Sequence, residues 1–269
     1  MTAGSQRLDA ALASRGLARS RTHAATLITE GLVTVDGRGV VKPSAPVTEE
    51  SVLVVAGADH YVSRAAHKLI AGLDAFDVVV AGRTALDLGA STGGFTQVLR
   101  ERGAEPVVAM DVGHGQVAAS VASDPGVIVI EGFNARDLTR ETLRAASRVD
   151  AAPDVVTADL SFISLTHVLG PIRDVMADGA DAVLLVKPQF EVGRTAVRGG
   201  LVTDAGLRAD AVTGVLWAAW DVGLRTLGVI SSPLVGTHGN AEFVVHFAAD
   251  RGTNPTEWLS TVSRLAGER

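Results

Sequence analysis

The stretch DLGASTGGFT, residues 87–96, decides the fold of this chain. It follows a short apolar run at 84–86 and opens a helix that the sequence predicts over 95–102. Its glycines can adopt positive φ and let the backbone approach a ligand, and the start of a helix offers N–H groups without intrahelical partners. No Gly-Lys-Ser/Thr follows, and the glycine spacing differs from the dinucleotide-binding fingerprint. The stretch therefore predicts a ligand-binding turn between a strand and a helix; the alternative is a plain βα turn in a doubly wound sheet.

The order Asp-x-Gly-x-x-x-Gly-Gly in this stretch is similar to motif I of S-adenosylmethionine (SAM) methyltransferases. In that motif the backbone holds the methionine end of the cofactor. The resemblance implies that SAM binds here, with contacts from Asp87, Gly89, Ala90, Ser91, Thr92, Gly93, Gly94 and Phe95.

Composition limits the class of protein. The 269 residues suffice for one large and one small domain, and a hydrophobic content of 47% indicates a well-formed core. The absence of cysteine excludes disulfides, thiolate metal sites and cysteine nucleophiles, and we predict no metal site. No run reaches the ~18–20 apolar residues of a membrane span, and the N-terminus lacks the apolar core of a signal peptide. We therefore expect a cytoplasmic protein. The sequence leaves its oligomeric state open and is compatible with a monomer.

Charge is distributed unevenly along the chain, whose net charge is −6. Residues 1–48 carry six basic and three acidic groups, a balance of +3, whereas residues 69–269 carry 16 basic and 24 acidic groups, a balance of −8. The local field, rather than the total charge, steers a polyanion toward a protein. The basic N-terminal part therefore predicts contact with nucleic acid.

Lysine is scarce, because only Lys42, Lys68 and Lys187 contribute to the 24 basic residues. The pKa of an ammonium group falls readily on burial, whereas a guanidinium hardly loses its proton. The three lysines are therefore candidates for acid–base chemistry; codon bias and chance are the alternative.

The first 55 residues predict a small module of two helices followed by short strands. Apolar residues recur at helical spacing over 6–16, and Ser20 can cap a second helix that Gly31 ends. The run RLDAALASRGLARSRTHAATLITEGLVTVDG, with Lys42-Pro43 after it, resembles the S-four-type RNA-binding module, named for a ribosomal protein. An ordinary helix-turn-helix with solvated arginines is the alternative. The RNA-binding candidates are Arg7, Arg15, Arg19, Arg21 and Lys42.

The rest of the chain predicts an α/β domain. A helix follows Ser63, which can cap it, and its apolar face leaves Lys68 outside. Beyond it, apolar strands alternate with helices, which indicates a parallel sheet covered on both faces. We predict an S-four-type α+β domain at 1–55, a linker at 56–62 and a Rossmann-like methyltransferase domain at 63–269, mostly parallel with an antiparallel last strand. Its strands are predicted at 84–88, 106–111, 127–131, 154–159, 182–187, 225–231 and 242–248.

Polar residues stand at the strand ends where open α/β sheets bind ligands. Asp111 ends the second predicted strand, where an acid can bind ribose hydroxyls, and Asn134-Ala135 follows the third and can meet an adenine edge. Asp159 ends the fourth strand, Lys187 the fifth, and Glu242 begins the antiparallel last strand. A single residue at such a position is commonly a solvated loop residue, but the convergence of several on one rim predicts a site.

Five segments extend the resemblance over nearly the whole chain: SRAAHKL, DLGASTGGFT, ADLSFISL, LVKPQFEVG and GNAEF. Together with the N-terminal module they resemble the TlyA family, rRNA 2′-O-methyltransferases with an FtsJ-like catalytic domain that are also called haemolysins. The resemblance implies a class I SAM methyltransferase fold and a Lys-Asp-Lys-Glu catalytic tetrad. In this chain the tetrad falls on Lys68, Asp159, Lys187 and Glu242.

The implied reaction transfers a methyl group to a ribose hydroxyl, so the protein must align the reactants and assist loss of a proton. Lys187 is the candidate that orients and deprotonates the 2′-hydroxyl, with Asp159 and Glu242 holding the lysines and the ribose. Arg194 and Arg198 are candidate phosphate contacts, with solvated loop arginines as the alternative. The resemblance implies cytidines of 16S and 23S rRNA in ribosomal subunits as targets, and a link between lost methylation and capreomycin resistance. A subset of the family modifies only the large subunit, and the complete N-terminal module favours the dual-target type.

Three other functions compete with this interpretation. Membrane lysis, suggested by the haemolysin name, lacks a membrane span and a strongly basic amphipathic helix in the sequence. A non-catalytic rRNA-binding or assembly factor would not need the tetrad, and a small-molecule methyltransferase would not need the N-terminal module.

Overall fold

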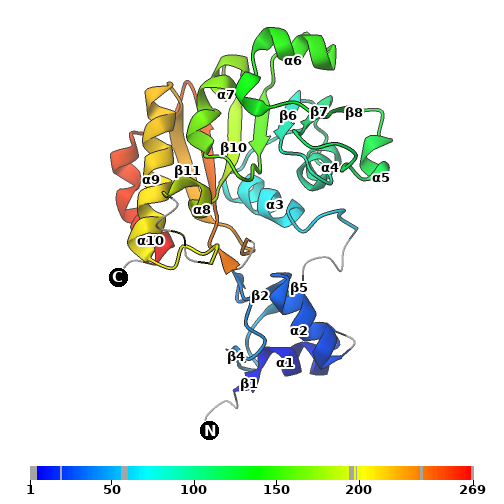
Figure 1. Ribbon diagram of the computed structural model, residues 1–269, viewed down its shortest axis with the longest axis vertical. Helices are drawn as coiled ribbons and strands as arrows, with labels where there is room; N and C mark the ends of the chain where they lie inside the picture. Colours follow the sequence, from blue (N-terminus) through cyan, green and yellow to red (C-terminus); the bar gives the residue numbers. More distant parts are fainter. Residues whose placement is uncertain are drawn as a thin grey trace.

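The structure is a computed structural model, and it describes residues 5–18, 20–55, 60–193, 197, 199–236 and 239–267. Figure 1 shows a small N-terminal part at the bottom of the view and a larger α/β part above it. Each part has a hydrophobic core of its own, because the buried apolar residues of 8–53 form a cluster separate from those that follow residue 65.

The larger part is built on a seven-stranded sheet with the order β11-β12-β10-β9-β6-β7-β8. β12 alone runs opposite to the other six strands, and it inserts between β10 and β11. The predicted fold class is therefore confirmed, and each predicted strand agrees with the observed one to within one residue at either end. The strands are β6 (Ala85–Leu88), β7 (Val107–Met110), β8 (Val127–Ile130), β9 (Val155–Ala158), β10 (Asp181–Val186), β11 (Arg225–Ser231) and β12 (Phe243–Ala248).

Helices cover both faces of this sheet, which explains why most of its strands are apolar on both sides. Alternate strand residues point to opposite faces, so Ala85 packs with α3 and α4, whereas Leu86 packs with α7 and α9. The α-helices are α3 (Ala66–Ala75), α4 (Gly94–Glu101), α5 (Ala119–Ala122), α6 (Arg140–Ser147), α7 (Leu169–Val175), α8 (Pro188–Glu191), α9 (Ala205–Asp221) and α10 (Leu259–Ala266). Short 3-10 turns lie at η1 (Ala135–Asp137), η2 (Leu165–His167) and η5 (Pro255–Trp258).

The N-terminal part has the predicted two helices followed by short strands. The Ser20 side chain accepts a hydrogen bond from the backbone of His23 and caps the second helix, as predicted. Asp36 and Gly37, both at positive φ, form the turn between two strands. Its elements are β1 (Gln6–Arg7), α1 (Leu8–Ser14), α2 (Arg21–Thr29), β2 (Val33–Val35), β3 (Arg38–Gly39), β4 (Pro46–Val47) and β5 (Leu53–Val55). The exact domain limits, including a linker at 56–62, stay a prediction.

Helix α3 differs from its prediction in two ways. It begins at Ala66 without a side-chain cap, because Ser63 instead accepts a hydrogen bond from the Ala65 backbone at 3.2 Å in a preceding turn. Lys68, predicted to lie off the buried face, is 5% exposed. The prediction was wrong because helical periodicity does not show that Glu242, which directly precedes the distant strand β12, covers this side of α3.

The N-terminal part rests on the segment between β11 and β12. Val235 of that segment lies so close to Gly39 that a Cβ added there would be 2.7 Å from the Val235 backbone nitrogen. A Cβ on Gly31 would likewise meet the Arg64 guanidinium at 2.8 Å, and one on Gly239 would meet Val41 at 2.9 Å. The N-terminal part thus contacts the segment that leads into Glu242 and the turn that leads into α3.

Candidate functional site

The turn after β6 has the sharp geometry that its sequence predicts. Gly89 and Gly93 have φ of 77° and 98°, and Ser91 between them has φ of 49°. A Cβ on Gly89 would lie 2.9 Å from the carbonyl oxygen of Asp159, so a larger residue does not fit there without a shift. Helix α4 begins directly after the turn, and its first N–H groups have no intrahelical acceptors.

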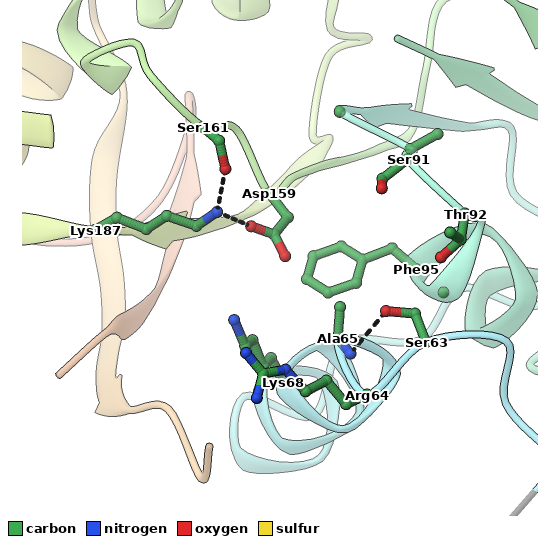
Figure 2. A pocket seen from close by; sticks show the side chains of 13 residues that line it. Ser63, Arg64, Ala65, Lys68, Ser91, Thr92, Phe95, Asp159, Ser161 and Lys187 are labelled. Atoms are coloured by element: carbon green, nitrogen blue, oxygen red, sulfur yellow. Dashed lines mark hydrogen bonds and ion pairs between the residues drawn. The ribbon is translucent and has the colours of Figure 1, made fainter. Parts of the chain in front are cut away.

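A cavity of about 180 Å³ opens beside this turn. Figure 2 shows that the turn after β6, the start of α3, and the ends of β9 and β10 all contribute to it. Glycines and short side chains leave the turn's backbone exposed to the cavity, which is the property needed to hold a ligand by main-chain hydrogen bonds. Its lining includes Gly89, Ala90, Ser91, Thr92, Gly94 and Phe95 from the predicted cofactor set, and Lys68, Asp159 and Lys187 from the predicted tetrad.

Asp87 lies in β6, two residues before Gly89, and is absent from the cavity lining. Its carboxylate accepts hydrogen bonds from the hydroxyls of Thr96 at 2.7 Å and Thr157 at 2.9 Å, and its exposure is 0%. Burial raises the pKa of Asp87 to about 6, against the lowering effect of these hydrogen bonds. In the structure, Asp87 therefore connects β6 to α4 and β9, and any contribution to cofactor binding is through the turn that it supports.

The other predicted cofactor residues stand on the same rim, outside the cavity lining. The Asp111 carboxylate accepts hydrogen bonds from the backbone of Ser91 at 2.8 Å and Gly113 at 2.7 Å, so it ties the glycine-rich turn to the segment after β7. Asn134 caps η1 by accepting from the Arg136 backbone at 3.1 Å, and Ala135 is the first residue of η1. Each carboxylate oxygen of Asp111 retains acceptor capacity for a ribose hydroxyl.

Two ion pairs bring the four predicted tetrad residues together. Lys187 Nζ lies 2.5 Å from Asp159 Oδ1 and donates to Ser161 Oγ at 2.9 Å. Lys68 Nζ lies 2.5 Å from Glu242 Oε2, and both side chains are at most 6% exposed. In Figure 2, Lys187 points toward Asp159 and Ser161, Lys68 comes from α3, and Arg64 comes from the turn that precedes α3.

A second cavity, of about 250 Å³, adjoins the first and shares Ser161 and Lys187 with it. Its lining combines aromatic rings with amides and the Glu242 carboxylate. The rings of Phe162 and Phe190 are 5.4 Å apart, and Phe162 is 92% exposed. Lys187 therefore stands where a polar cavity bounded by backbone meets a second cavity with aromatic walls.

Several residues of this site were not predicted from the sequence. Arg64 lines the first cavity and Gln189 the second, and Arg64 Nη1 and Gln189 Oε1 are buried without a hydrogen-bond partner among the described residues. Ser161 contacts Lys187, and Glu191 contacts the segment after β9. All four residues lie inside the segments SRAAHKL, ADLSFISL and LVKPQFEVG, whose resemblance to the family marks them as part of the site. The spacing within these segments does not show which atoms each side chain contacts.

The predicted RNA-binding residues divide into two groups. Arg7 and Arg21 remain 52% and 61% exposed in their side chains, and both pair with Asp9, at 2.8 Å and 3.4 Å. The hydrogen bond from Arg7 lowers the pKa of Asp9 to about 2. Arg15 instead donates to the carbonyl oxygens of Thr48, Glu49 and Ser51, which is a structural contact. Lys42 is exposed and directly precedes Pro43, whose carbonyl accepts a hydrogen bond from the Asp9 backbone in α1. Arg19, Arg194 and Arg198 lie outside the described residues.

Within the described part of the chain, no group of three or more His, Asp or Glu side chains is placed to hold a metal ion. None of the described helices is both long enough and apolar enough to cross a membrane.

Comparison with known proteins identifies the family. A family model of FtsJ-like methyltransferases matches residues 61–249, and one of the S4 domain matches residues 6–53. The 16S/23S rRNA (cytidine-2′-O)-methyltransferase TlyA of Mycobacterium tuberculosis is 51% identical over 88% of this chain and 87% of its own. The 23S rRNA (cytidine-2′-O)-methyltransferase TlyA of Campylobacter jejuni is 30% identical over 77% of this chain and 81% of its own. A solved structure from Streptococcus thermophilus, described under the hemolysin name, covers 98% of this chain and 95% of its own at 31% identity and a TM-score of 0.74. The chain therefore belongs to the TlyA family of FtsJ-like methyltransferases.

Proposed function

We propose that this chain transfers a methyl group from SAM to the 2′-hydroxyl of cytidine in 16S and 23S rRNA of ribosomal subunits. The observation that carries the proposal is the position of Lys187, which pairs with Asp159 at 2.5 Å and lines both adjoining cavities. One cavity has the exposed backbone that suits the cofactor, and the other has the aromatic walls that suit a nucleotide. A group at their junction can contact the reacting oxygen.

The first cavity fits SAM by its donor set. The glycine-rich turn presents backbone N–H groups, which suit the carboxylate of the methionine end, and Asp111 on the same rim offers acceptors for ribose hydroxyls. A Cβ at Gly89 would occupy the close approach between this turn and Asp159. When bound, SAM supplies a methyl group on a positively charged sulfur, which leaves as a neutral thioether.

The second cavity fits an unstacked nucleotide. Enzymes that modify a nucleotide inside structured nucleic acid extrude it from its stack, and extruded bases stack on aromatic side chains. Phe162 and Phe190 provide such faces beside Lys187. We propose that the base lies against these rings and that its ribose points toward the junction.

Lys187 performs the proton step in this proposal. An ammonium has three donors: Ser161 Oγ accepts from one of them, and Asp159 lies at 2.5 Å as an ion-pair partner, so a further donor remains for the ribose 2′-oxygen. In its neutral form the amine accepts the hydroxyl proton while the oxygen lone pair bonds to the methyl carbon. Asp159 holds the amine in place and stabilises its protonated form. Lys68 and Glu242, buried as a pair, fix the base of the site between α3 and β12.

The target and setting follow the relatives. The relative with 51% identity is named for both 16S and 23S rRNA, and the two-part arrangement of this chain matches a dual target, although the Campylobacter relative is named for 23S alone. Arg7, Arg21 and Lys42 would contact rRNA from the N-terminal domain, and Arg194 and Arg198 from the segment after Lys187. Described residues of one chain line both cavities, so we propose a monomer that acts on ribosomal subunits in the cytoplasm.

The test is methyl transfer from labelled SAM to purified, unmethylated 30S and 50S subunits, followed by mapping of ribose methylation on both rRNAs. We expect one methylated cytidine per subunit type with the unaltered chain and none with Lys187→Ala, while Lys187→Ala still binds SAM. Binding of subunits without methyl transfer would support an assembly factor instead. Methylation of 23S alone would correct the target.

A further inference from the structure

The segment after β9 and the segment after β10 are joined at two places. At their starts, Lys187 contacts Asp159 at 2.5 Å and Ser161 at 2.9 Å. At their far ends, the Glu191 carboxylate accepts a hydrogen bond from Ser164 Oγ at 2.5 Å and another from the Leu165 backbone at 2.9 Å. The stretch 159–165 is therefore held as an arch over the short helix α8.

A glutamate at position 191 is not explained by packing alone, because a carboxylate is costly to bury. Burial raises the pKa of Glu191, and the hydrogen bonds from Ser164 and the Leu165 backbone offset this rise only in part, so the carboxylate is held there at a cost. An apolar side chain of the same length would avoid this cost. The two donors give a reason for the carboxylate, because together they fix both the position and the direction of the arch.

The arch carries a residue in a strained conformation. Phe162 has φ of 65°, a region that bulky side chains rarely adopt, and its ring is 92% exposed beside Phe190. Such a conformation persists only where surrounding contacts determine it, and it commonly occurs at functional sites. The contacts that flank Phe162 are those of Lys187 on one side and Glu191 on the other.

We propose that Glu191 is a positioning residue: it fixes the arch so that Asp159 and Ser161 stay on Lys187 and Phe162 stands at the wall of the nucleotide cavity. This inference rests on the proposed function, because it assigns the arch to the methyl-transfer step. Among the described residues, the side-chain hydrogen bonds of Glu191 go to Ser164 and Leu165, and Glu191 is not part of the cofactor cavity lining, so it acts through these two residues.

The variants Glu191→Met and Glu191→Gln separate the hydrogen bonds from the shape. Methionine matches the length but accepts no hydrogen bond. Glutamine can accept from the Leu165 N–H through its oxygen and donate to Ser164 Oγ through its nitrogen. We expect Glu191→Met to lower kcat by about 10–100-fold, since a displacement of about 1 Å can cost 10²-fold, with SAM affinity within about threefold of the unaltered chain. Glu191→Gln should restore most of kcat, and the exposed Glu257→Met is the matched control.

Two further measurements decide between positioning and mere stability. Hydrogen exchange should show faster exchange of the Leu165 amide in Glu191→Met and slow exchange in Glu191→Gln, whether or not the enzyme turns over. Adding Ser164→Ala to Glu191→Met should lower kcat little further, because contacting residues that act together are not additive. Two results would overturn the inference. In the first, Glu191→Met loses protection of the Leu165 amide but keeps kcat. In the second, Glu191→Met lowers the amount of folded protein while kcat per folded molecule is unchanged. An unaltered chain that methylates no subunit would contradict the proposed function instead, and the exchange result would still report whether Glu191 holds the arch.

Discussion

Lys68 and Glu242 lie 174 residues apart in the chain, yet their side chains form an ion pair of 2.5 Å inside the protein. The lysine comes from α3 at the start of the catalytic domain, and the glutamate precedes the last strand of the sheet. Because both side chains are almost fully enclosed, each neutralises a charge that would otherwise be expensive to bury.

Removing one partner of this pair should be costly. Glu242→Ala leaves the Lys68 ammonium enclosed without its carboxylate, and breaking such buried pairs typically costs about 3–5 kcal/mol. The surface pair Arg144–Asp150, with side chains 71% and 79% exposed, is the matched control, and Asp150→Ala should cost at most about 1 kcal/mol. Urea unfolding of both variants measures the difference. Equal losses of unfolding free energy would contradict the account of the buried pair, and the double variant Lys68→Met/Glu242→Leu should recover stability without activity.

Lys187→Arg should retain the positive charge and lose the chemistry. The Lys187 side chain is 10% exposed between Asp159 and Ser161, so a larger planar guanidinium cannot occupy the same place, and it hardly deprotonates. We expect kcat to fall by about 10²-fold or more, the range for loss of a general base, while SAM binding measured by calorimetry persists. Turnover within a few-fold of the unaltered enzyme would show that charge alone suffices at this position.

Gly93→Val should weaken the cofactor site through the backbone. Gly93 has φ of 98°, and a Cβ there would lie 2.9 Å from Val121 Cγ1, so the substitution meets both backbone strain and a neighbouring side chain. A left-handed backbone conformation costs a residue with a Cβ about 1–2 kcal/mol. If the turn adopts this conformation only when SAM is bound, the cost corresponds to about a 5–30-fold loss of SAM affinity. Gly214→Ala is the control, because its Cβ meets open space in the middle of α9. An unchanged SAM affinity in a folded Gly93→Val protein would refute the assignment of this turn.

The double variant Arg7→Ala/Arg21→Ala should weaken subunit binding and its dependence on salt. Both guanidinium groups are more than half exposed, and they share the single carboxylate of Asp9, so a positive charge remains for a phosphate. Each lost phosphate contact should flatten the log–log salt slope by about 0.7–0.9. Affinity for subunits across a salt series measures this effect, with SAM affinity as the internal control. Superimposable lines for the two proteins would place rRNA binding on the catalytic domain.

Stability should fall in acid through Asp181. Burial alone would raise the pKa of this carboxyl, but hydrogen bonds from His246 and Arg83 and the charge of Arg251 lower it to about 2. A lowered folded-state pKa stabilises the fold above the unfolded value of about 3.9. That contribution, about 2 kcal/mol, is lost as the pH falls from about 4 to about 2.

Urea unfolding at pH 5 and pH 3 tests this prediction. The difference in unfolding free energy between the two pH values should shrink in Asp181→Asn and stay unchanged in the exposed variant Asp221→Asn. The same pH dependence in Asp181→Asn and the unaltered chain would assign the acid sensitivity to other carboxylates.

Much of the fold follows from local sequence. Residues 87–96 place an acid, small residues and two glycines between a buried strand and an amphipathic helix, and only a sharp turn satisfies that order. Most strands of the large sheet are apolar on both sides, and the limits of the seven strands could be predicted to within one residue. In the N-terminal module, Ser20 and Gly37 act within a few residues of their own position, which is why a cap and a turn were predictable.

The contacts that complete the site depend on residues far apart in the chain. The sequence determined that lysines and acids stand at strand ends on one rim, but only the tertiary structure decided that Lys68 is buried against Glu242 and that Glu191 holds Ser164. Likewise, Arg15 was predicted as an RNA-binding candidate, whereas folding directs its guanidinium to the backbone carbonyls of Thr48 and Ser51. Local patterns record which side chains prefer burial or a turn; they do not record which distant partner satisfies a charge, because that partner is chosen by the packing of the whole sheet and its covering helices.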